Sequence, residues 1–373
     1  MTKLRLGVIG TGAFAEACHV PGLQSHPRAE VVALCGRDLA RTRALAERLH
    51  VPEITTDFRE LCARKDLDAI TIATPNACHA SQAQAAFAAG KHVFCEKPLG
   101  MTVREVREML RIAEGSHRVH QVAFTYRYLY GVQELKRRVL QGDVGAPYYV
   151  RVKHESWEGL HPDAKVGFRE KLDLGGGGVL YDVGSHLFDL VQFVLGPVHS
   201  VLGDMILVPR ERLDPKTGAL VPVETDDVVS AWFCCENGVH GHLFASRATP
   251  SSGEKAFIEV VGPQGALKAS LSRGSMDVLS LSRPMHPAWE RVPLPEGAAD
   301  GQAHCLPRMM GSFVEACLRG KLDGAVDASF HDGLAVQQAM EGVQEASQKQ
   351  AWIRLTGDGG FSIPDASVPL RDP

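Results

Sequence analysis

An aspartate and a histidine recur at helical spacing in the stretch GGGGVLYDVGSHLFD, residues 175–189. Asp182, His186 and Asp189 stand at positions i, i+4 and i+7, so on a helix they share one face. Such a pair can move a proton, because histidine titrates near neutral pH. The alternative is a histidine whose partner is structural. We predict no metal, since no third ligand has convincing spacing, and we expect the four glycines to let the backbone approach a ligand.

A lysine ends an apolar run in a second stretch, CEKPLG. His92–Cys95 is typical of a buried strand, and Glu96 and Lys97 follow it directly. In an open parallel sheet, ligands bind beyond the carboxyl ends of the strands. A lysine at such an end can hydrogen-bond the oxygen of a reacting hydroxyl or carbonyl group. The alternative is an ordinary solvated Glu–Lys pair.

Glycines with the spacing of a dinucleotide-binding turn follow the first apolar run. The stretch GVIGTGAFAEA places Gly10, Gly12 and Ala15 in a G-x-G-x-x-A pattern between a strand and a helix. Gly10 permits the tight turn, and Gly12 lets a pyrophosphate approach the backbone. The first N–H groups of the helix then face the phosphates. We therefore expect this turn, with Ala13 and Phe14, to bind the cofactor; a plain glycine turn is the alternative.

The end of the second strand bears on the choice between NADP and NAD. An acid at this point would bind the ribose 2′-hydroxyl of NAD, but the chain has Gly36, with Arg37 next and Arg41 a turn further on. A small residue followed by arginine favours NADP, because a guanidinium group binds phosphate oxygens in a bidentate way. NAD stays open as the alternative, with Arg37 covering the adenine or Asp38 serving as the acid.

Two kinds of domain have to position these residues. Up to residue 122, short apolar runs alternate with helical patterns, which predicts a parallel sheet with crossover helices. Strands are expected at Leu4–Ile9, Val31–Cys35, Ala69–Ala73 and His92–Cys95. Beyond residue 122, alternating runs on both sides of Asn237-Gly238 predict a hairpin, whereas 204–227 includes an expected surface loop. We predict an α/β chain with a Rossmann domain over 1–122 and an α+β domain with an open, mainly antiparallel sheet over 123–373.

Composition argues against several classes of protein. The chain has 373 residues, 45% of them hydrophobic and 23% charged, with a net charge of −4. This charge predicts no nucleic-acid or membrane-surface partner, and no apolar run is long enough to span a bilayer. The N-terminus lacks the pattern of a signal peptide. Nine cysteines without metal-binding spacing indicate reduced thiols and a cytoplasmic location.

Four stretches resemble the family of glucose–fructose oxidoreductase, inositol dehydrogenase and rhizopine-catabolism proteins (Gfo/Idh/MocA). They are GVIGTGAFAEACH, ATPNACHASQAQAAFAAGKHVFCEKPLGMT, TYRY and GGGGVLYDVGSHLFD. The resemblance implies that Lys97 lies beside the nicotinamide and joins Asp182 and His186 in catalysis. It also implies that Glu96 contacts the cofactor ribose and that the peptide bond before Pro98 is cis.

The resemblance further places Thr74, Pro75 and Asn76 against the pyrophosphate and ribose. His79 matches a family position too, and a structural role at a helix start is its alternative. Five aromatic or polar residues would suit a sugar ring: Tyr126, Arg127, His154, Trp157 and Arg169. For each of them, packing in the core or on the sheet is the alternative.

The predicted activity is hydride transfer between a nicotinamide cofactor and a secondary alcohol or ketone of a sugar, polyol or derivative. His186 accepts the hydroxyl proton, Lys97 stabilises the oxyanion, and Asp182 holds the substrate or tunes Lys97. A redox-neutral glycosidase or lyase with the same site, and a dinucleotide-binding regulator without turnover, are the alternatives. The apolar run VVSAWFCC favours a homodimer or homotetramer.

Overall fold

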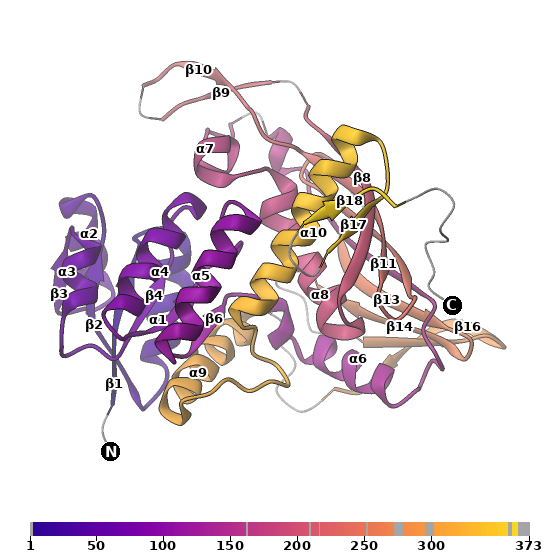
Figure 1. The fold of residues 1–373 in the computed structure, drawn as a ribbon, viewed down its shortest axis with the longest axis horizontal. Helices are drawn as coiled ribbons and strands as arrows, with labels where there is room; N and C mark the ends of the chain where they lie inside the picture. The colour runs from indigo at the N-terminus through magenta and orange to yellow at the C-terminus, as the bar shows by residue number, and fades with distance from the viewer. Residues whose placement is uncertain are drawn as a thin grey trace. The chain divides into compact units, whose positions relative to one another are not determined.

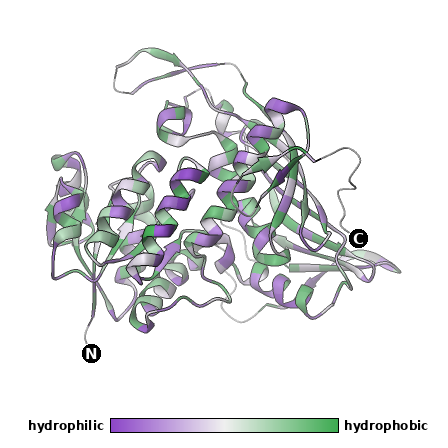
Figure 2. Cartoon of the chain, in the orientation of Figure 1, coloured by the Kyte–Doolittle hydropathy of each residue, from purple (hydrophilic) through white to green (hydrophobic). Residues whose placement is uncertain are grey.

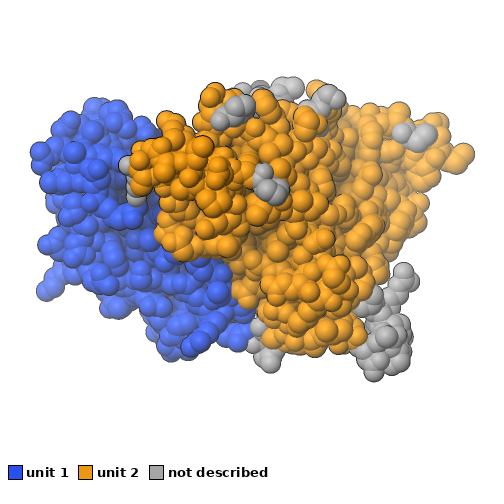
Figure 3. All heavy atoms as spheres, turned by 90° about the horizontal axis from the view of Figure 1, so that it is seen from above, with its two compact units in different colours: residues 1–128, 303–334 blue, residues 129–302, 335–373 orange. Residues whose placement is uncertain are grey.

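The computed structural model describes residues 3–161, 163–208, 210–215, 217–250, 253–271, 279–294, 302–356 and 360–364. The chain divides into two compact units, coloured separately in Figure 3. Unit 1 comprises residues 1–128 and 303–334, and unit 2 comprises residues 129–302 and 335–373. The predicted domain bounds, residues 1–122 and 123–373, remain a proposal.

Unit 1 is built on a six-stranded parallel sheet (Figure 1). Its strands are β1 (Leu4–Ile9), β2 (Ala29–Cys35), β3 (Glu53–Thr55), β4 (Ala69–Ile72), β5 (His92–Cys95) and β6 (His120–Val122). Their order, β3-β2-β1-β4-β5-β6, is that of a doubly wound nucleotide-binding sheet. The central strands are apolar and buried, because helices cover both faces of such a sheet. This confirms the predicted Rossmann fold.

Three of the helices of unit 1, α2, α3 and α5, begin after a residue whose side chain caps them. The helices of this unit are η1 (Ala15–His19), α1 (Val20–Gln24), α2 (Leu39–Arg48), α3 (Phe58–Ala63), η2 (Asn76–Cys78), α4 (His79–Ala88), α5 (Val103–Ser116), η3 (Thr125–Tyr128) and α9 (Gln302–Arg319). Thr102 caps α5 by accepting a hydrogen bond from the backbone N–H of Glu105 at 3.2 Å. Such helices carry hydrophilic and hydrophobic residues on the same ribbon in Figure 2, as expected for one buried face.

Late segments of the chain return to unit 1. A Cβ at Gly22 of α1 would lie 2.7 Å from Cγ of Met310 in α9. The first turn of α10 (Phe330–Lys349) packs similarly, since a Cβ at Gly333 would lie 2.7 Å from Cδ2 of Leu99. The close approach of these elements needs glycine at both positions.

Unit 2 is built on a ten-stranded mixed sheet. Its strands are β7 (Tyr149–Glu155), β8 (Val198–Ile206), β11 (Val228–Cys235), β12 (His240–Ser246), β13 (Ala256–Gly262), β14 (Gly265–Ser270), β15 (Leu279–Arg283), β16 (His286–Val292), β17 (Ile353–Leu355) and β18 (Phe361–Ser362). Only β7 and β12 pair in parallel among these described strands. The predicted hairpin is present as β11 and β12, and Gly238 in its turn has φ +81°. The predicted open, mainly antiparallel sheet is therefore confirmed.

The helices of unit 2 are α6 (Tyr130–Leu140), η4 (Glu158–Leu160), η5 (Phe168–Glu170), α7 (Leu172–Gly175), η6 (Leu180–Gly184), α8 (Ser185–Leu195) and most of α10. Of these, α6, η6, α8 and α10 contact strands of the ten-stranded sheet. Phe188 of α8 contacts Phe233 of β11 edge to face, with ring centroids 6.2 Å apart. The segment expected as a surface loop contains a separate hairpin of β9 (Glu211–Leu213) and β10 (Leu220–Pro222). Among the described residues, no helix is both long and apolar enough to cross a bilayer.

Candidate active site

The glycine turn after β1 combines one strained glycine and one open glycine. Gly10 has φ +125°, and a Cβ there would lie 2.2 Å from the carbonyl oxygen of Ala73. At Gly12, no heavy atom of the described residues lies within 4 Å of the place that a Cβ would take. Ala13 is exposed and Phe14 half-buried beside it. The turn thus fits a dinucleotide, because it leaves room at the backbone for a pyrophosphate.

The end of β2 has no room for an acidic side chain. A Cβ at Gly36 would lie 2.4 Å from Thr42 Oγ1 and 2.5 Å from Thr11 Cγ2. Arg37 and Arg41 are exposed next to it. Asp38, the alternative acid, caps α2, since its Oδ1 accepts the backbone N–H of Arg41 at 3.0 Å. The residues that the chain offers here to an adenosine ribose are therefore predominantly basic.

His79 connects the loops that follow β4 and β5. Its Nδ1 lies 3.0 Å from the carbonyl oxygen of Pro98, and its Nε2 lies 3.0 Å from that of Thr74. The ring is fully buried, and burial lowers its pKa because it penalises the charged form. His79 therefore links the two loops through backbone oxygens, and its contact with a cofactor stays a prediction. Of the other residues predicted here, Asn76 is buried, Pro75 is half-buried and Thr74 donates its hydroxyl to Gln82 Oε1 at 2.7 Å.

Glu96 and Lys97 are both buried where β5 ends. Glu96 Oε1 lies 3.0 Å from Nε2 of His19, and Glu96 Oε2 accepts the backbone N–H of Lys97 at 3.3 Å. The Lys97–Pro98 peptide bond is cis, as the resemblance implied. His19 itself is fully buried at the end of η1, and its ring meets Phe94 edge to face. Sequence reasoning gave His19 no role, although it closes the first of the four family-like stretches.

Asp182 and His186 lie on one continuous helical segment of unit 2. A π-helical turn, η6, carries Asp182, and α8 begins one residue before His186. Asp182 Oδ1 forms an ion pair with Nε of Arg169 at 2.9 Å. His186 and Asp189 are buried, whereas Asp182 is half-buried. Arg169, predicted to bind substrate, thus holds one of the predicted catalytic carboxylates.

The other predicted substrate residues lie in different settings. Arg127 is buried within unit 1, where its NH2 group donates to Asp332 Oδ1 at 2.8 Å. Tyr126 is buried beside it in the sequence. In unit 2, His154 lies on β7 and is half-buried, while Trp157 is 50% exposed. The ion pair accounts for the burial of Arg127 without a substrate, and the substrate roles of these four residues remain predictions.

The described residues contain no group of three or more His, Cys, Asp or Glu side chains that could hold a metal ion. Unit 1 contributes a buried lysine and a buried glutamate together with a turn suited to a dinucleotide, and unit 2 contributes a histidine and an aspartate.

Comparison with known proteins assigns both parts of the chain. Residues 4–124 match the oxidoreductase family with an NAD-binding Rossmann fold, and residues 132–268 match the GFO/IDH/MocA C-terminal domain. Together the two matches cover well over half of the chain. The protein belongs to the Gfo/Idh/MocA family of NAD-binding oxidoreductases.

Several relatives match along almost the whole chain. Levoglucosan dehydrogenase of Pseudarthrobacter phenanthrenivorans is 27% identical over an alignment 398 residues long, and this alignment covers 95% of this chain and 98% of that protein. An oxidoreductase domain protein from Kribbella flavida has a solved structure with 29% identity and a TM-score of 0.85, covering 95% of this chain and 100% of that one. A levoglucosan dehydrogenase in complex with NADH and levoglucosan shares the fold, with a TM-score of 0.87 at 24% identity, covering 95% of this chain and 99% of that one.

Proposed function

We propose that this protein is a cytoplasmic NAD(P)-dependent dehydrogenase or ketoreductase of a sugar, polyol or sugar derivative. The observation that carries the proposal is the end of β5, where the buried Glu96 and Lys97 follow a strand of a nucleotide-binding sheet. A dehydrogenase among the relatives that is named for a sugar derivative supports the substrate class. A regulator without turnover has no need of a proton-transfer pair such as Asp182 and His186.

The roles follow from the side chains. A bound nicotinamide supplies or accepts the hydride. Nδ1 of His186 is buried, so we assign the transfer of the hydroxyl proton to Nε2. Lys97 Nζ stabilises the negative charge that develops on the substrate oxygen. Arg169 holds the Asp182 carboxyl group through an ion pair, and that group can accept a hydrogen bond from a substrate hydroxyl group.

For the cofactor we propose NADP, with NAD as the alternative that the relatives favour. The lack of room at Gly36 and the exposed Arg37 support a 2′-phosphate. The NADH complex of a protein with the same fold supports NAD(H) instead. Gly10, Gly12, Ala13, Phe14 and the loop at 74–76 would hold the parts that both cofactors share.

We further propose that two or four copies of the chain assemble through the outer face of the unit 2 sheet. Trp232 of β11 is 48% exposed there, and its ring lies 4.9 Å from that of His242 and 6.3 Å from that of Tyr149. Trp289 of β16 is also exposed. A second copy of the same face would bury these aromatic rings, which are commonly the anchors of protein interfaces.

A substrate panel tests the proposed function. Sugars, polyols and their ketone forms are supplied with NAD+, NADP+ or the reduced cofactors, and nicotinamide absorbance is followed. We expect turnover that Lys97→Ala abolishes and that the exposed Lys65→Ala, a matched control, leaves intact. Turnover that survives Lys97→Ala would overturn the assignment of Lys97. Glycoside cleavage without net change in absorbance would favour the redox-neutral alternative, and tight cofactor binding without any turnover would favour a regulator.

A further inference from the structure

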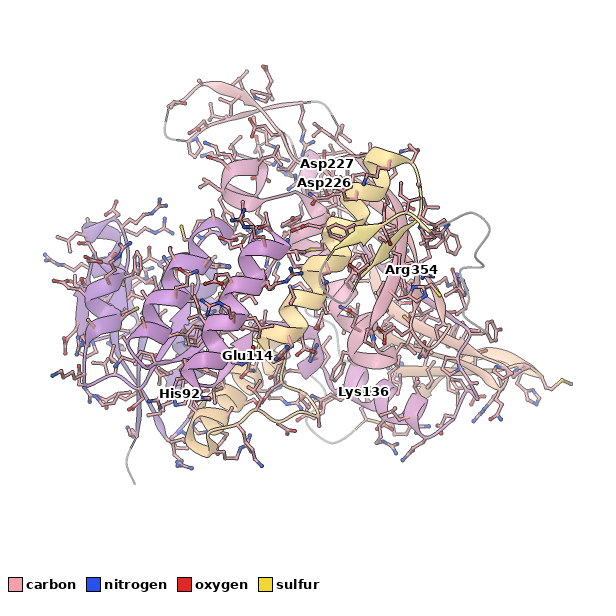
Figure 4. The ribbon with its side chains drawn as sticks, viewed as in Figure 1. His92, Glu114, Lys136, Asp226, Asp227 and Arg354 are labelled. Atoms are coloured by element: carbon pink, nitrogen blue, oxygen red, sulfur yellow. The ribbon has the colours of Figure 1, made fainter. Side chains whose placement is uncertain are left out.

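Thr225 and Asp226, which we call the Asp226 bracket, hold the start of the helix that carries Asp182 and His186. Figure 4 labels Asp226 and its neighbour Asp227. Both carboxylate oxygens of Asp226 are used: the backbone N–H of Gly178 donates to Oδ1 at 2.7 Å, and that of Leu180 donates to Oδ2 at 2.8 Å. The backbone N–H of Val179 donates to the carbonyl oxygen of Asp226 at 3.0 Å. Three successive N–H groups at the start of the helix therefore find their acceptors on one residue.

Two of the four glycines before the helix lie close to other backbone, Gly178 to Asp226 and Gly175 to Phe168. A Cβ at Gly178 would lie 1.9 Å from the carbonyl oxygen of Asp226 and 2.7 Å from its backbone nitrogen. A Cβ at Gly175 would lie 2.9 Å from the carbonyl oxygen of Phe168. The sequence predicted that the glycines let a ligand approach, which stays a prediction; in the structure Gly175 and Gly178 let the chain's own backbone come close.

A second residue of the bracket reaches the partner of Asp182. Thr225 donates its hydroxyl to the carbonyl oxygen of Arg169 at 3.0 Å and accepts a hydrogen bond from NH2 of Arg247 at 2.8 Å. Arg169 in turn pairs with Asp182. Two neighbouring bracket residues thus fix Asp182 from two sides, one through the helix start and one through Arg169.

A helix start of this kind needs an outside acceptor. The first N–H groups of any helix lack partners within the helix, and here the first turn is the wide π-helical turn η6. Burial raises the pKa of Asp226, and the hydrogen bonds from the N–H groups of Leu180 and Gly178 oppose that effect because they favour the charged form. Bonds from N–H groups to a carboxylate are short and strong. Asp226 therefore supplies the outside acceptors that this helix start needs.

We propose that Asp226 is a positioning residue for catalysis, and that it sets the placement of Asp182 and His186 without touching the substrate. This inference rests on the proposed function, in which those two side chains take part in the reaction. Small misplacements of catalytic groups are costly, and about 1 Å can lower a rate by roughly 100-fold. Loss of the bracket should therefore lower kcat while the cofactor-binding turn in unit 1 stays unchanged.

Asp226→Asn is the decisive variant, because an amide NH2 group cannot accept the hydrogen bond that the carboxylate oxygen accepted. Asp227→Asn is the matched control, since Asp227 lies in the same loop but pairs with Arg210 and Arg247 instead of the helix start. For Asp226→Asn we expect kcat to fall about 10- to 100-fold with an unchanged dissociation constant for the dinucleotide. For Asp227→Asn we expect a lower melting temperature and a much smaller loss of kcat.

Hydrogen exchange of the backbone amides supplies a readout that does not depend on activity. In Asp226→Asn the amides of Gly178 and Leu180 should exchange faster than in the wild type, whereas in Asp227→Asn they should stay protected. Unchanged exchange in Asp226→Asn, faster exchange with unchanged kcat, or equal losses of kcat in both variants would each overturn the proposal. Where Asp226→Asn does not fold, Thr225→Val takes its place, with an expected loss of kcat of up to about tenfold.

The exchange experiment also separates this inference from the proposed function. A wild-type protein without turnover on the substrate panel would contradict the proposed function. In that event, faster exchange at residues 178–180 would still establish the bracket as the element that orders the helix start, and its catalytic consequence would be refuted together with the activity.

Discussion

Gly10→Ala should lower the stability of this protein, whereas Gly12→Ala should lower its affinity for a dinucleotide, because the two glycines have different surroundings. At Gly10 the backbone has φ +125°, and a Cβ would lie 2.2 Å from the oxygen and 2.7 Å from the carbon of the Ala73 carbonyl group. At Gly12 the described part of the chain leaves the corresponding space open out to 4 Å. The first substitution therefore strains the fold, and the second fills space in front of the backbone.

The magnitudes follow from these contacts. A non-glycine residue in such a backbone conformation costs about 1–3 kcal/mol, and an overlap with a packed backbone costs about 1–3 kcal/mol more. Gly10→Ala should thus lower the free energy of unfolding by about 2–6 kcal/mol, a large part of the roughly 5–15 kcal/mol typical of a domain. Gly12→Ala should change it by less than about 0.5 kcal/mol.

Cofactor binding should respond in the other order. The methyl group of Gly12→Ala lies where a pyrophosphate would approach, so we expect the dinucleotide dissociation constant to rise at least tenfold, or about 1.4 kcal/mol. Urea denaturation measures the stability of both variants, and calorimetric titration with NAD+ and NADP+ measures their affinity. Wild-type affinity in Gly12→Ala would refute the role of this turn in binding. Wild-type stability in Gly10→Ala would refute the close contact with Ala73.

Three further predictions concern cofactor choice, pH and assembly. Arg37→Ala should raise KM for NADP about tenfold or more and leave KM for NAD nearly unchanged, since charge-assisted bonds contribute about 1.5–3 kcal/mol. Equal effects on KM for both cofactors in steady-state kinetics would contradict the NADP proposal. Burial lowers the pKa of His79 in the folded protein below its unfolded value of about 6.5. The contribution of His79 to stability is therefore complete above about pH 6.5 and is lost as the pH falls from there towards the lower pKa of the folded state. Melting temperatures between pH 8 and 5 should fall less steeply in His79→Gln than in the wild type, and an unchanged slope would exclude His79 as a cause. Trp232→Lys should give a smaller species than the wild type in light scattering after size exclusion, and a monomeric wild type would rule out the proposed assembly.

Local patterns were sufficient to predict the sheet of unit 1. β1 and β5 have the predicted limits, because short apolar runs bounded by glycine or charge are buried on both faces of a parallel sheet. The hairpin of β11 and β12 could also be predicted from the sequence, since Asn237-Gly238 suits a turn with positive φ. In each instance, residues close in the chain determine the structure.

Contacts between distant segments escaped the sequence reasoning. Nothing in the pattern around α9 and the start of α10 indicated that residues 303–334 return to unit 1. The burial of Arg127 by Asp332 depends on that return. His19 also meets Glu96 across 77 positions of sequence, a separation at which residue type and spacing carry no signal.

The sequence by itself determined the glycine turn of the NAD-binding domain and the class of fold, because each depends on residue type within a short window. It also proposed the side chains for proton transfer, Lys97, Asp182 and His186. The tertiary structure decided what holds those side chains in place. His79 joins two loops through backbone oxygens, and Asp226 lies 48 positions from the glycine whose N–H group it binds. A hydrogen bond depends on distance in space, and the packing of a whole unit sets that distance.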